Sequence, residues 1–461
     1  MDDKRQKIQL ELALTAGTEG EAQGAASRGT ESSKTWRETE SPALPERLME
    51  EVVRPENLKQ ALKRVRSNKG SPGIDGMTVD ELPGYLAKHW PVLREQLLSG
   101  AYKPQPVKRV EIEKPDGGMR RLGIPTVRDR FIQQAVMQVL QSGWDRTFSE
   151  HSYGFRPGRS AHQAVGKAQE YIAEGLRYVV DIDLEKFFDR VNHDKLMGRL
   201  ARHVADKRML KIIRAFLNAG VMEKGLVGPT DEGAPQGGPL SPLLSNIVLD
   251  ELDRELEKRG HRFVRYADDC NIYVRSERAG RRVMESAKDF IAKKLKLKVN
   301  DKKSAVARPK DRKFLGFSFT IGRQPKRRIA PKAVERFKNR VRELTPRTRG
   351  VSIERMAGEL AVYLRGWQGY FSYCQTPSVL RDLDYWVRRR LRCVVWKQWK
   401  RGTARFDELR KRGVSKTLAA QTAGSVHGPW HLAWSPALHV ALPDAYFISL
   451  GLPRLTVASN A

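Results

Sequence analysis

The chain has little cysteine, no long apolar run and fewer acidic than basic residues. Its three cysteines, Cys270, Cys374 and Cys393, make neither a disulfide framework nor a zinc site. No run of about 18 apolar residues is present and the N-terminus opens on charged residues, so the sequence shows neither a membrane span nor a secretory signal. We therefore expect a reduced, cytoplasmic protein without a membrane partner.

Basic residues dominate the 461-residue chain, with 85 Lys and Arg against 54 Asp and Glu and a formal net charge of +31. This excess predicts a polyanionic partner, because cations neutralise phosphates and release their counterions. An acidic membrane surface would be the competing partner, but with neither a membrane span nor a signal in the sequence we expect nucleic acid. The length is typical of two or three domains, and a hydrophobic content of 40% is enough for real cores.

Apolar spacing and the placement of Gly and Pro predict a mixture of helices and strands. Helices are expected at 52–65, 129–142 and 278–295, and in several segments between 184 and 219. Strands are expected as a hairpin at 107–112 and 121–124, at 178–183, as a second hairpin over 263–274, and at 297–299 and 314–320. Since no simple βαβ order results, we expect the α+β class. From residue 331 onward the chain is helical, basic and rich in tryptophan.

Two adjacent acids stand in the second hairpin, within Tyr266-Ala267-Asp268-Asp269. Asp is disfavoured in strands, and neighbouring carboxylates repel each other. A divalent cation reverses that penalty, because Mg²⁺ prefers hard oxygen ligands. Asp183 ends an expected strand and offers a third carboxylate, with Asp181 two residues earlier on the same strand face. A polar hairpin turn and a solvated strand end are the alternatives that these residues leave open.

Seven motifs follow one another in a fixed order: KPDGGMRRLGIP (114–125), SYGFRP (152–157), DLEKFFD (183–189), PQGG (235–238), YADD (266–269), NDKKS (300–304) and FLGF (314–317). In this order and spacing they resemble a bacterial group II intron-encoded reverse transcriptase and maturase, over residues from about 50 to 461. The resemblance implies a right-hand polymerase with fingers (46–165), a palm with an antiparallel sheet (166–330), an α-helical thumb or X domain (331–404) and a short C-terminal DNA-binding region (405–461). Residues 1–45 are rich in Glu, Ser, Thr, Gly and Ala, and this composition predicts a disordered or partly helical leader.

The resemblance also implies a two-metal centre. Asp183, Asp268 and Asp269 match the family's metal-binding aspartates, and Leu184 is a further metal-binding position. Two Mg²⁺ ions, with Mn²⁺ as a substitute, would activate a 3′-hydroxyl and stabilise the leaving pyrophosphate. Lys303 resembles the lysine that protonates pyrophosphate, with Lys302 as the adjacent alternative.

Five residues match the family's nucleotide-binding positions. Lys114 and Arg120 correspond to finger-hairpin cations that hold the incoming triphosphate. Gln236 and Gly237 correspond to residues lining the nucleotide site, where Gly lets the backbone approach closely. Phe188 corresponds to the steric gate, an aromatic ring that leaves no room for a ribose 2′-hydroxyl. Ordinary surface charge and a plain core aromatic are the alternatives for the cations and for Phe188.

Residues 331–420 hold 22 Lys and Arg but only 8 Asp and Glu, a net charge of +14. The aromatic and leucine positions at helical spacing are expected to face a core: Leu360, Tyr363, Leu364, Trp367, Tyr370 and Phe371. The cations expected to face RNA are Arg365, Arg388, Arg389, Arg390, Arg392, Lys397 and Lys400. Arg156, in the SYGFRP loop, is predicted either to contact template or triphosphate or to form a structural salt bridge.

The function implied is RNA-directed DNA polymerisation, with deoxynucleoside triphosphates, an RNA template and a DNA or RNA primer. The family also binds group II intron RNA to promote splicing, and target DNA for mobility (retrohoming). No His-Asn-His segment with cysteine pairs follows the thumb in this sequence, so an endonuclease-lacking type in the bacterial cytoplasm is expected. Two alternatives stay open: an intron-independent reverse transcriptase in DNA repair or defence, and an RNA-binding maturase with little polymerase activity.

Overall fold

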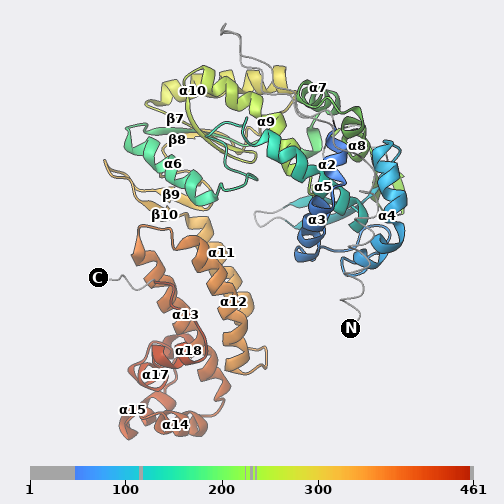
Figure 1. Ribbon diagram of the computed structural model, residues 1–461. Helices are drawn as coiled ribbons and strands as arrows, with labels where there is room; N and C mark the ends of the chain where they lie inside the picture. The colour runs from blue at the N-terminus through green and yellow to red at the C-terminus, as the bar shows by residue number, and fades with distance from the viewer. Residues whose placement is uncertain (1–46, 114–117, 224, 229–231, 234–235, 457–461) are drawn as a thin grey trace, which may run out of the picture. The chain divides into compact units, whose positions relative to one another are not determined.

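The computed structural model describes residues 47–113, 118–223, 225–228, 232–233 and 236–456 (Figure 1). These residues divide between two compact units. Unit 1 takes the described part of Met1–Ala168 and Leu176–Ala307, and unit 2 takes that of Gln169–Gly175 and Arg308–Ala461. The predicted palm, 166–330, is thus shared between the units, and the predicted leader lies outside the described residues. Over the described ranges, no helix is both long and apolar enough to cross a membrane.

An antiparallel sheet in unit 1 carries the acidic residues. Among the described strands its order is β6-β7-β3-β8, and the bounds are β6 Arg262–Tyr266, β7 Asp269–Val274, β3 Tyr178–Ile182 and β8 Ala305–Ala307. Side chains alternate between the two faces of a sheet. One face is apolar and buried, with Val180, Ile182, Cys270 and Ile272 in the core. Asp181, Asn271 and the residues that extend these strands belong to the opposite face.

Helices cover the apolar face. α10 (Glu277–Phe290) contacts β3, β7 and β8, and α9 (Ser241–Lys258) contacts β6 (Figure 1). The approach of α10 requires Gly280, because a Cβ there would come within 2.5 Å of the Val306 side chain. The acidic face is therefore the face of the sheet that α9 and α10 do not cover.

The second sheet of unit 1 has the described order β2-β1-β4-β5. β1 (Val107–Glu113) and β2 (Met119–Ile124) form the predicted hairpin, and β4 (Val221–Glu223) joins β1 in parallel. β5 (Leu226–Gly228) pairs with β4. Neither β4 nor β5 was predicted, because each is only three residues long and their side chains lack an alternating buried pattern.

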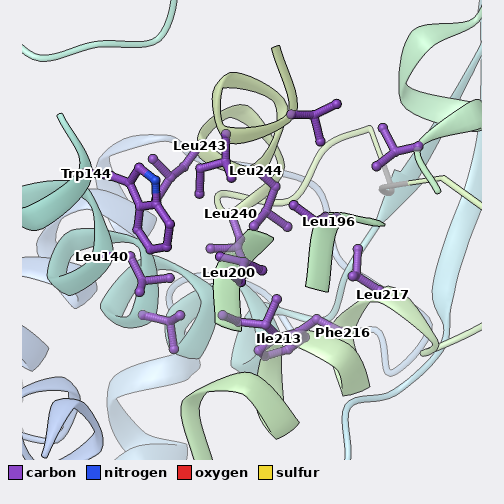
Figure 2. Packing of buried hydrophobic residues seen from close by; sticks show 14 of the residues in the cluster. Leu140, Trp144, Leu196, Leu200, Ile213, Phe216, Leu217, Leu240, Leu243 and Leu244 are labelled. Carbon is purple, nitrogen blue, oxygen red and sulfur yellow. The ribbon is translucent and has the colours of Figure 1, made fainter. Parts of the chain in front are cut away.

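The remaining helices of unit 1 pack around one core. Their bounds are α2 Leu48–Val52, α3 Pro55–Ser67, α4 Leu82–Leu98, α5 Val127–Trp144, α6 Ala161–Ala173 (which runs into residues assigned to unit 2), η1 Phe187–Arg190, α7 His193–His203, α8 Lys207–Leu217 and η2 Ile291–Leu295. Figure 2 shows Trp144 of α5 among leucines of α7 and α9, with Phe216 of α8 in the same cluster. Side-chain caps at Thr126, Asn192, Asp206 and Ser276 begin α5, α7, α8 and α10.

Unit 2 pairs a short hairpin with a helical body. The hairpin is β9 (Phe317–Phe319) with β10 (Arg327–Ile329). The predicted strand at 297–299 belongs to unit 1, where it is reduced to a single bridge between Val299 and Leu184. The helices are α11 Pro331–Leu344, α12 Ile353–Phe371, α13 Pro377–Gln398, α14 Gly402–Lys411, α15 Lys416–Ala423, α16 Pro429–Leu432, α17 Pro436–Ala441 and α18 Asp444–Ser449. The α+β class is therefore confirmed, with a helical C-terminal region.

The expected core face of α12 is present. Leu360, Leu364 and Trp367 are buried, and the Trp367 ring lies 4.4 Å from that of Phe337 on α11. The three other aromatic residues predicted to face inward are only partly buried and pack at the edge of this core or against its hairpin: Tyr363, Tyr370 and Phe371.

Candidate active site

Asp268 and Asp269 lie where the β6–β7 hairpin turns. Tyr266 pairs with Asp269, so Ala267 and Asp268 form a two-residue turn. Ile182 of β3 pairs with Cys270 of β7. Asp183, one residue further along β3, is therefore level with Asp269 on the acidic face of the sheet. The register brings the three predicted aspartates to one end of the sheet.

Electrostatics couple two of these acids. Burial raises the pKa of Asp268 above its ordinary value, and the negative charge of Asp183 raises it further, whereas Arg120 and Arg265 act in the opposite direction. Across the described ranges, no three His, Cys, Asp or Glu side chains are gathered closely enough to hold a metal ion. The three predicted carboxylates therefore do not form one compact cluster in this structure. Asp269 is exposed, whereas Asp183 and Asp268 interact electrostatically.

The donor chemistry of this pair fits a hard divalent cation. Carboxylate oxygens are the preferred ligands of Mg²⁺, and a cation relieves the repulsion between two nearby acids. Leu184 can offer only a backbone carbonyl, since its side chain is apolar and buried.

The NDKKS segment lies directly beside Asp183. The Ser304 hydroxyl accepts a hydrogen bond from the backbone N–H of Asp183 at 3.0 Å, and the Asn300 N–H donates to the Asp183 carbonyl at 2.8 Å. A turn joins Lys303 N–H to the Asn300 carbonyl at 3.1 Å. Both candidate proton donors, Lys302 and Lys303, are exposed on this turn. The structure therefore places them in the segment bonded to the first acid of the centre.

A cavity of about 550 Å³ opens beside Asp268 within unit 1. Its lining includes four of the predicted nucleotide-binding residues, namely Arg120, Phe188, Gln236 and Gly237. Lys114, the fifth, lies outside the described residues. Asp183, Asp269 and Lys303 are not among the lining residues.

Sequence reasoning missed three prominent members of the cavity lining. Arg130 and Gln134 come from α5, and Phe155 comes from the SYGFRP loop. Arg130 is buried and donates to the Ser71 carbonyl at 2.6 Å. Phe155 belongs to the SYGFRP motif, so the motif itself could have indicated this residue.

Arg156 forms the salt bridge that was the alternative interpretation. Its Nε lies 2.8 Å from Asp145, and its other nitrogens donate to the carbonyls of Ser149, Ser152 and Asp145. The side chain is buried and does not face the cavity. Phe155 is instead 46% exposed, with a φ of 59° that turns the chain at this point.

Backbone contacts hold Gln236 and Gly237, which line the same cavity as Asp268. The Gly123 N–H on β2 donates to the Gln236 carbonyl at 2.8 Å. Gly237 follows with a φ of 131°, and a Cβ there would lie 2.7 Å from the Gly123 carbonyl oxygen. Only glycine tolerates both constraints. Gln236 and Gly237 are thus held against the β1–β2 hairpin.

Phe188 lines two neighbouring cavities. It is half-buried, packs edge-on against Phe187 at 5.2 Å, and lines both the main cavity and a second one of about 390 Å³. The turn before it uses Lys186 in a left-handed conformation with φ 49°. A bulky ring at this point narrows the space beside Asp268.

Several cations predicted to face RNA are internal to unit 2. Arg388 is buried, paired with Asp384 and 3.4 Å from Asp444, and Arg392 donates to Asp444 and to the Leu442 carbonyl. Their predicted RNA contacts are wrong for this reason: the charges are used in the core between α13 and α18.

The other cations of this set keep part of their surface. Arg390 donates to Thr345, and Arg389 stacks on Trp430 with its guanidinium carbon 4.3 Å from the ring centroid. Arg365 is exposed although it donates to the Gly451 carbonyl. Lys397 and Lys400 are exposed as well.

Comparison with known proteins matches both units to described families. Residues 112–319 match "Reverse transcriptase (RNA-dependent DNA polymerase)", and residues 334–413 match "Group II intron, maturase-specific domain". The first match covers the acidic sheet and most of the cavity lining. The second begins in α11 and ends after α14.

Individual relatives agree with these matches. Protein YkfC of Escherichia coli (strain K12) is 39% identical over 231 residues, which is 49% of this chain and 61% of the relative. Group II intron-encoded protein LtrA of Lactococcus lactis subsp. cremoris is 30% identical over 343 residues, 60% of this chain and 57% of the relative. The chain thus spans about three fifths of the length of each.

Among solved structures, a chain of the partial Cas6-RT-Cas1–Cas2 complex is 24% identical over 53% of this chain and 42% of its own length, with a TM-score of 0.35. Both domain matches and the sequence relatives point to one family. With a reverse transcriptase domain followed by a maturase-specific domain, the protein belongs to the group II intron-encoded reverse transcriptase and maturase family.

Proposed function

We propose that the protein is an RNA-directed DNA polymerase whose centre lies at the β6–β7 turn. The observation that carries the proposal is the placement of Asp268 in the wall of the cavity that also receives Arg120, Phe188 and Gln236. An acid, a cation, an aromatic wall and a backbone-lined loop are what a nucleoside triphosphate requires of a binding site. The level position of Asp183 supports the same assignment.

Divalent ions would be held by Asp183 and Asp268, with Asp269 and the Leu184 carbonyl as the further proposed ligands. When bound, two Mg²⁺ ions, or Mn²⁺ in their place, stabilise charge on the attacking and leaving oxygens of an in-line displacement. The pair of acids would supply the hard oxygen donors, Asp183 from the end of β3 and Asp268 from the turn between β6 and β7. A bound cation would offset the burial and the Asp183 charge that raise the pKa of Asp268.

The remaining residues would position the nucleotide and primer. Arg120, together with Lys114, would neutralise the triphosphate. Phe188 would close the space beside the sugar, and Gln236 and Gly237 would present backbone groups to the base or template. Lys303, or Lys302 beside it, would give a proton to the leaving pyrophosphate. The substrates proposed are deoxynucleoside triphosphates and an RNA template with a DNA or RNA primer.

Primer extension tests the polymerase. Wild-type protein is expected to extend a DNA primer on an RNA template with Mg²⁺ and deoxynucleotides. Asp268→Ala combined with Asp269→Ala removes two acids of the centre and should abolish extension. Absence of extension by the wild type with any divalent metal would contradict the proposal.

We also propose that the protein binds group II intron RNA and promotes its splicing, and that it engages target DNA for mobility. The match of residues 334–413 to the maturase-specific domain and the net charge of +14 over 331–420 favour this second function. The proposal includes no nicking step, so priming would use nascent strands or a nick made elsewhere. We propose that the protein acts on these nucleic acids in the bacterial cytoplasm.

A splicing assay separates the two functions. The double alanine variant at 268 and 269 keeps the basic surface of unit 2, so it is expected to support splicing without copying RNA. Loss of splicing in a folded double variant would show that the two functions are not separable. Absence of intron sequence beside the gene would instead favour a role in DNA repair or defence.

A further inference from the structure

Arg265 is fully buried on β6, and each of its N–H groups is hydrogen-bonded. Nε and Nη2 donate to the two carboxylate oxygens of Asp253, at 2.7 and 2.5 Å. Nη2 donates also to the Ser152 hydroxyl at 2.8 Å, and Nη1 to the side-chain oxygen of Asn246 at 3.0 Å. The last bond, from Nη1, reaches the backbone carbonyl of Ala267 at 2.9 Å. These contacts use all five donors of a guanidinium.

Ala267 is the residue of the turn whose conformation most needs support. It has a φ of 57°, in the left-handed region that residues with a Cβ adopt at a cost. Gly154 contacts the same turn, because a Cβ at 154 would lie 2.2 Å from the Ala267 nitrogen. The Asn246 amide in turn donates to the Gly154 carbonyl at 2.9 Å. The turn is therefore fixed by the Arg265 bond and by contact with the Gly154 backbone.

The network joins three separate parts of unit 1 at this turn. Asp253 and Asn246 lie on α9, and Ser152 lies in the segment that runs beside β6. Backbone hydrogen bonds on both sides of Ser152 join that segment to Arg265. The Arg265 N–H donates to the His151 carbonyl, and the Arg265 carbonyl accepts from the Tyr153 N–H, both at 2.9 Å. A displacement of Arg265 would therefore move the backbone of Ala267, the residue before Asp268.

We propose that Arg265, oriented by Asp253, is a positioning residue that holds the Ala267 carbonyl and so fixes the Asp268–Asp269 turn in its working conformation. The inference rests on the proposed polymerase function of that turn. Arg265 acts through the backbone of Ala267, and it is not among the residues that line the cavity. Lysine cannot replace it, because a single ammonium group cannot bridge a carboxylate, an amide oxygen, a hydroxyl and a carbonyl in one plane.

Three variants separate positioning from general stability. Arg265→Lys keeps the charge opposite Asp253 but removes the fork. Ser152→Ala deletes one acceptor and is mild enough to fold if the first variant does not. Arg199→Lys is the matched control, because Arg199 pairs with Glu251 and donates to the Val248 carbonyl of the same helix α9 without reaching the turn.

The first readout is amide hydrogen exchange of residues 262–274 in protein without metal. Arg265→Lys is expected to speed exchange at the turn, with a smaller effect of the same sign in Ser152→Ala. Arg199→Lys should leave exchange at the turn unchanged, even if it lowers the Tm as much as Arg265→Lys does. Unchanged exchange in folded Arg265→Lys, or in Ser152→Ala where the first variant is unfolded, overturns the proposal, as does an equal change in the control.

The second readout is primer extension over a Mg²⁺ titration. Loss of a well-placed turn is expected to lower kcat by about 10²-fold and to raise the Mg²⁺ needed for half-maximal rate, with little change in the KM for nucleotide. An unchanged kcat and Mg²⁺ dependence in Arg265→Lys would count against positioning. Failure of wild type to extend primers would refute the polymerase, whereas the exchange measurement would still decide the role of Arg265.

Discussion

The backbone N–H of Gly123 donates a 2.8 Å hydrogen bond to the carbonyl of Gln236, and this bond attaches the segment that begins at Gln236 to β2. Gly237 follows in a backbone conformation reserved for glycine, with no room for a Cβ beside the Gly123 carbonyl. The bond therefore depends on a residue without a side chain.

Gly237→Ala is expected to pull this segment away from β2. The strain of a φ of 131° and the 2.7 Å approach to the Gly123 oxygen together cost about 1 to 3 kcal/mol. Because Gln236 lines the cavity, the variant should raise the KM for nucleotide in primer extension. Gly198→Ala is the control, since its added Cβ on α7 meets no atom within 4 Å. That control should keep the wild-type KM.

Phe188→Ala is expected to weaken the selection of deoxynucleotides over ribonucleotides. Removing the ring opens the space beside Asp268, so the ratio of kcat/KM for the two sugars should fall by about 10- to 100-fold. Phe155→Ala truncates another aromatic of the cavity lining and serves as the control. A ratio that falls equally in both variants would show that Phe188 is merely part of the wall.

How much the sequence could predict is clearest at the acidic sheet. The pattern of Val179 to Ile182 and of 263–274 predicts strands, and the register then brings Asp183 level with Asp269. The three-residue strand β8, which completes that sheet, has too few residues for any periodic signal. Local pattern therefore finds long elements and misses the short ones that pair with them.

The candidate site shows the same limit for side chains. The order of the motifs predicted Arg120, Phe188, Gln236 and Gly237, and all four line the cavity. It could not predict that Arg388 is buried: Asp384 lies only four residues before it, but the second partner, Asp444, lies 56 residues away and only the fold brings it to this arginine. A run of arginines indicates charge, and tertiary packing decides which of its members reach solvent.

Asp206 makes the stability of unit 1 depend on pH in the acid range. Burial would raise the pKa of Asp206, but hydrogen bonds from Arg208 and from the Met49 N–H outweigh it, and the pKa is lowered. The Arg208 hydrogen bond lowers the pKa of Glu50 as well. Groups with lowered pKa values stabilise the fold above their ordinary values of 3.8 and 4.5, and this stability is lost as the pH falls below them.

Asp206→Asn should therefore reduce the free energy of unfolding by about 1 to 2 kcal/mol at neutral pH, because a charged hydrogen bond becomes a neutral one. The difference from wild type should shrink as the pH falls from 5 toward 2. Denaturant unfolding over that range measures it. A difference that stays constant with pH would show that the ion pair with Arg208 is not its source.

Lys397 and Arg388 lie on the same helix, α13, and should respond to substitution in opposite ways. Lys397 is exposed, so Lys397→Ala should weaken binding to intron RNA and reduce the slope of log affinity against log salt by about 0.7 to 1, without a change in Tm. Arg388→Ala leaves Asp384 as an uncompensated buried acid and should cost about 3 to 5 kcal/mol of stability. RNA titrations at several salt concentrations, each paired with a melting curve, distinguish the two. If Lys397→Ala left the salt slope unchanged, the exposed face of α13 would not be part of the RNA-binding surface.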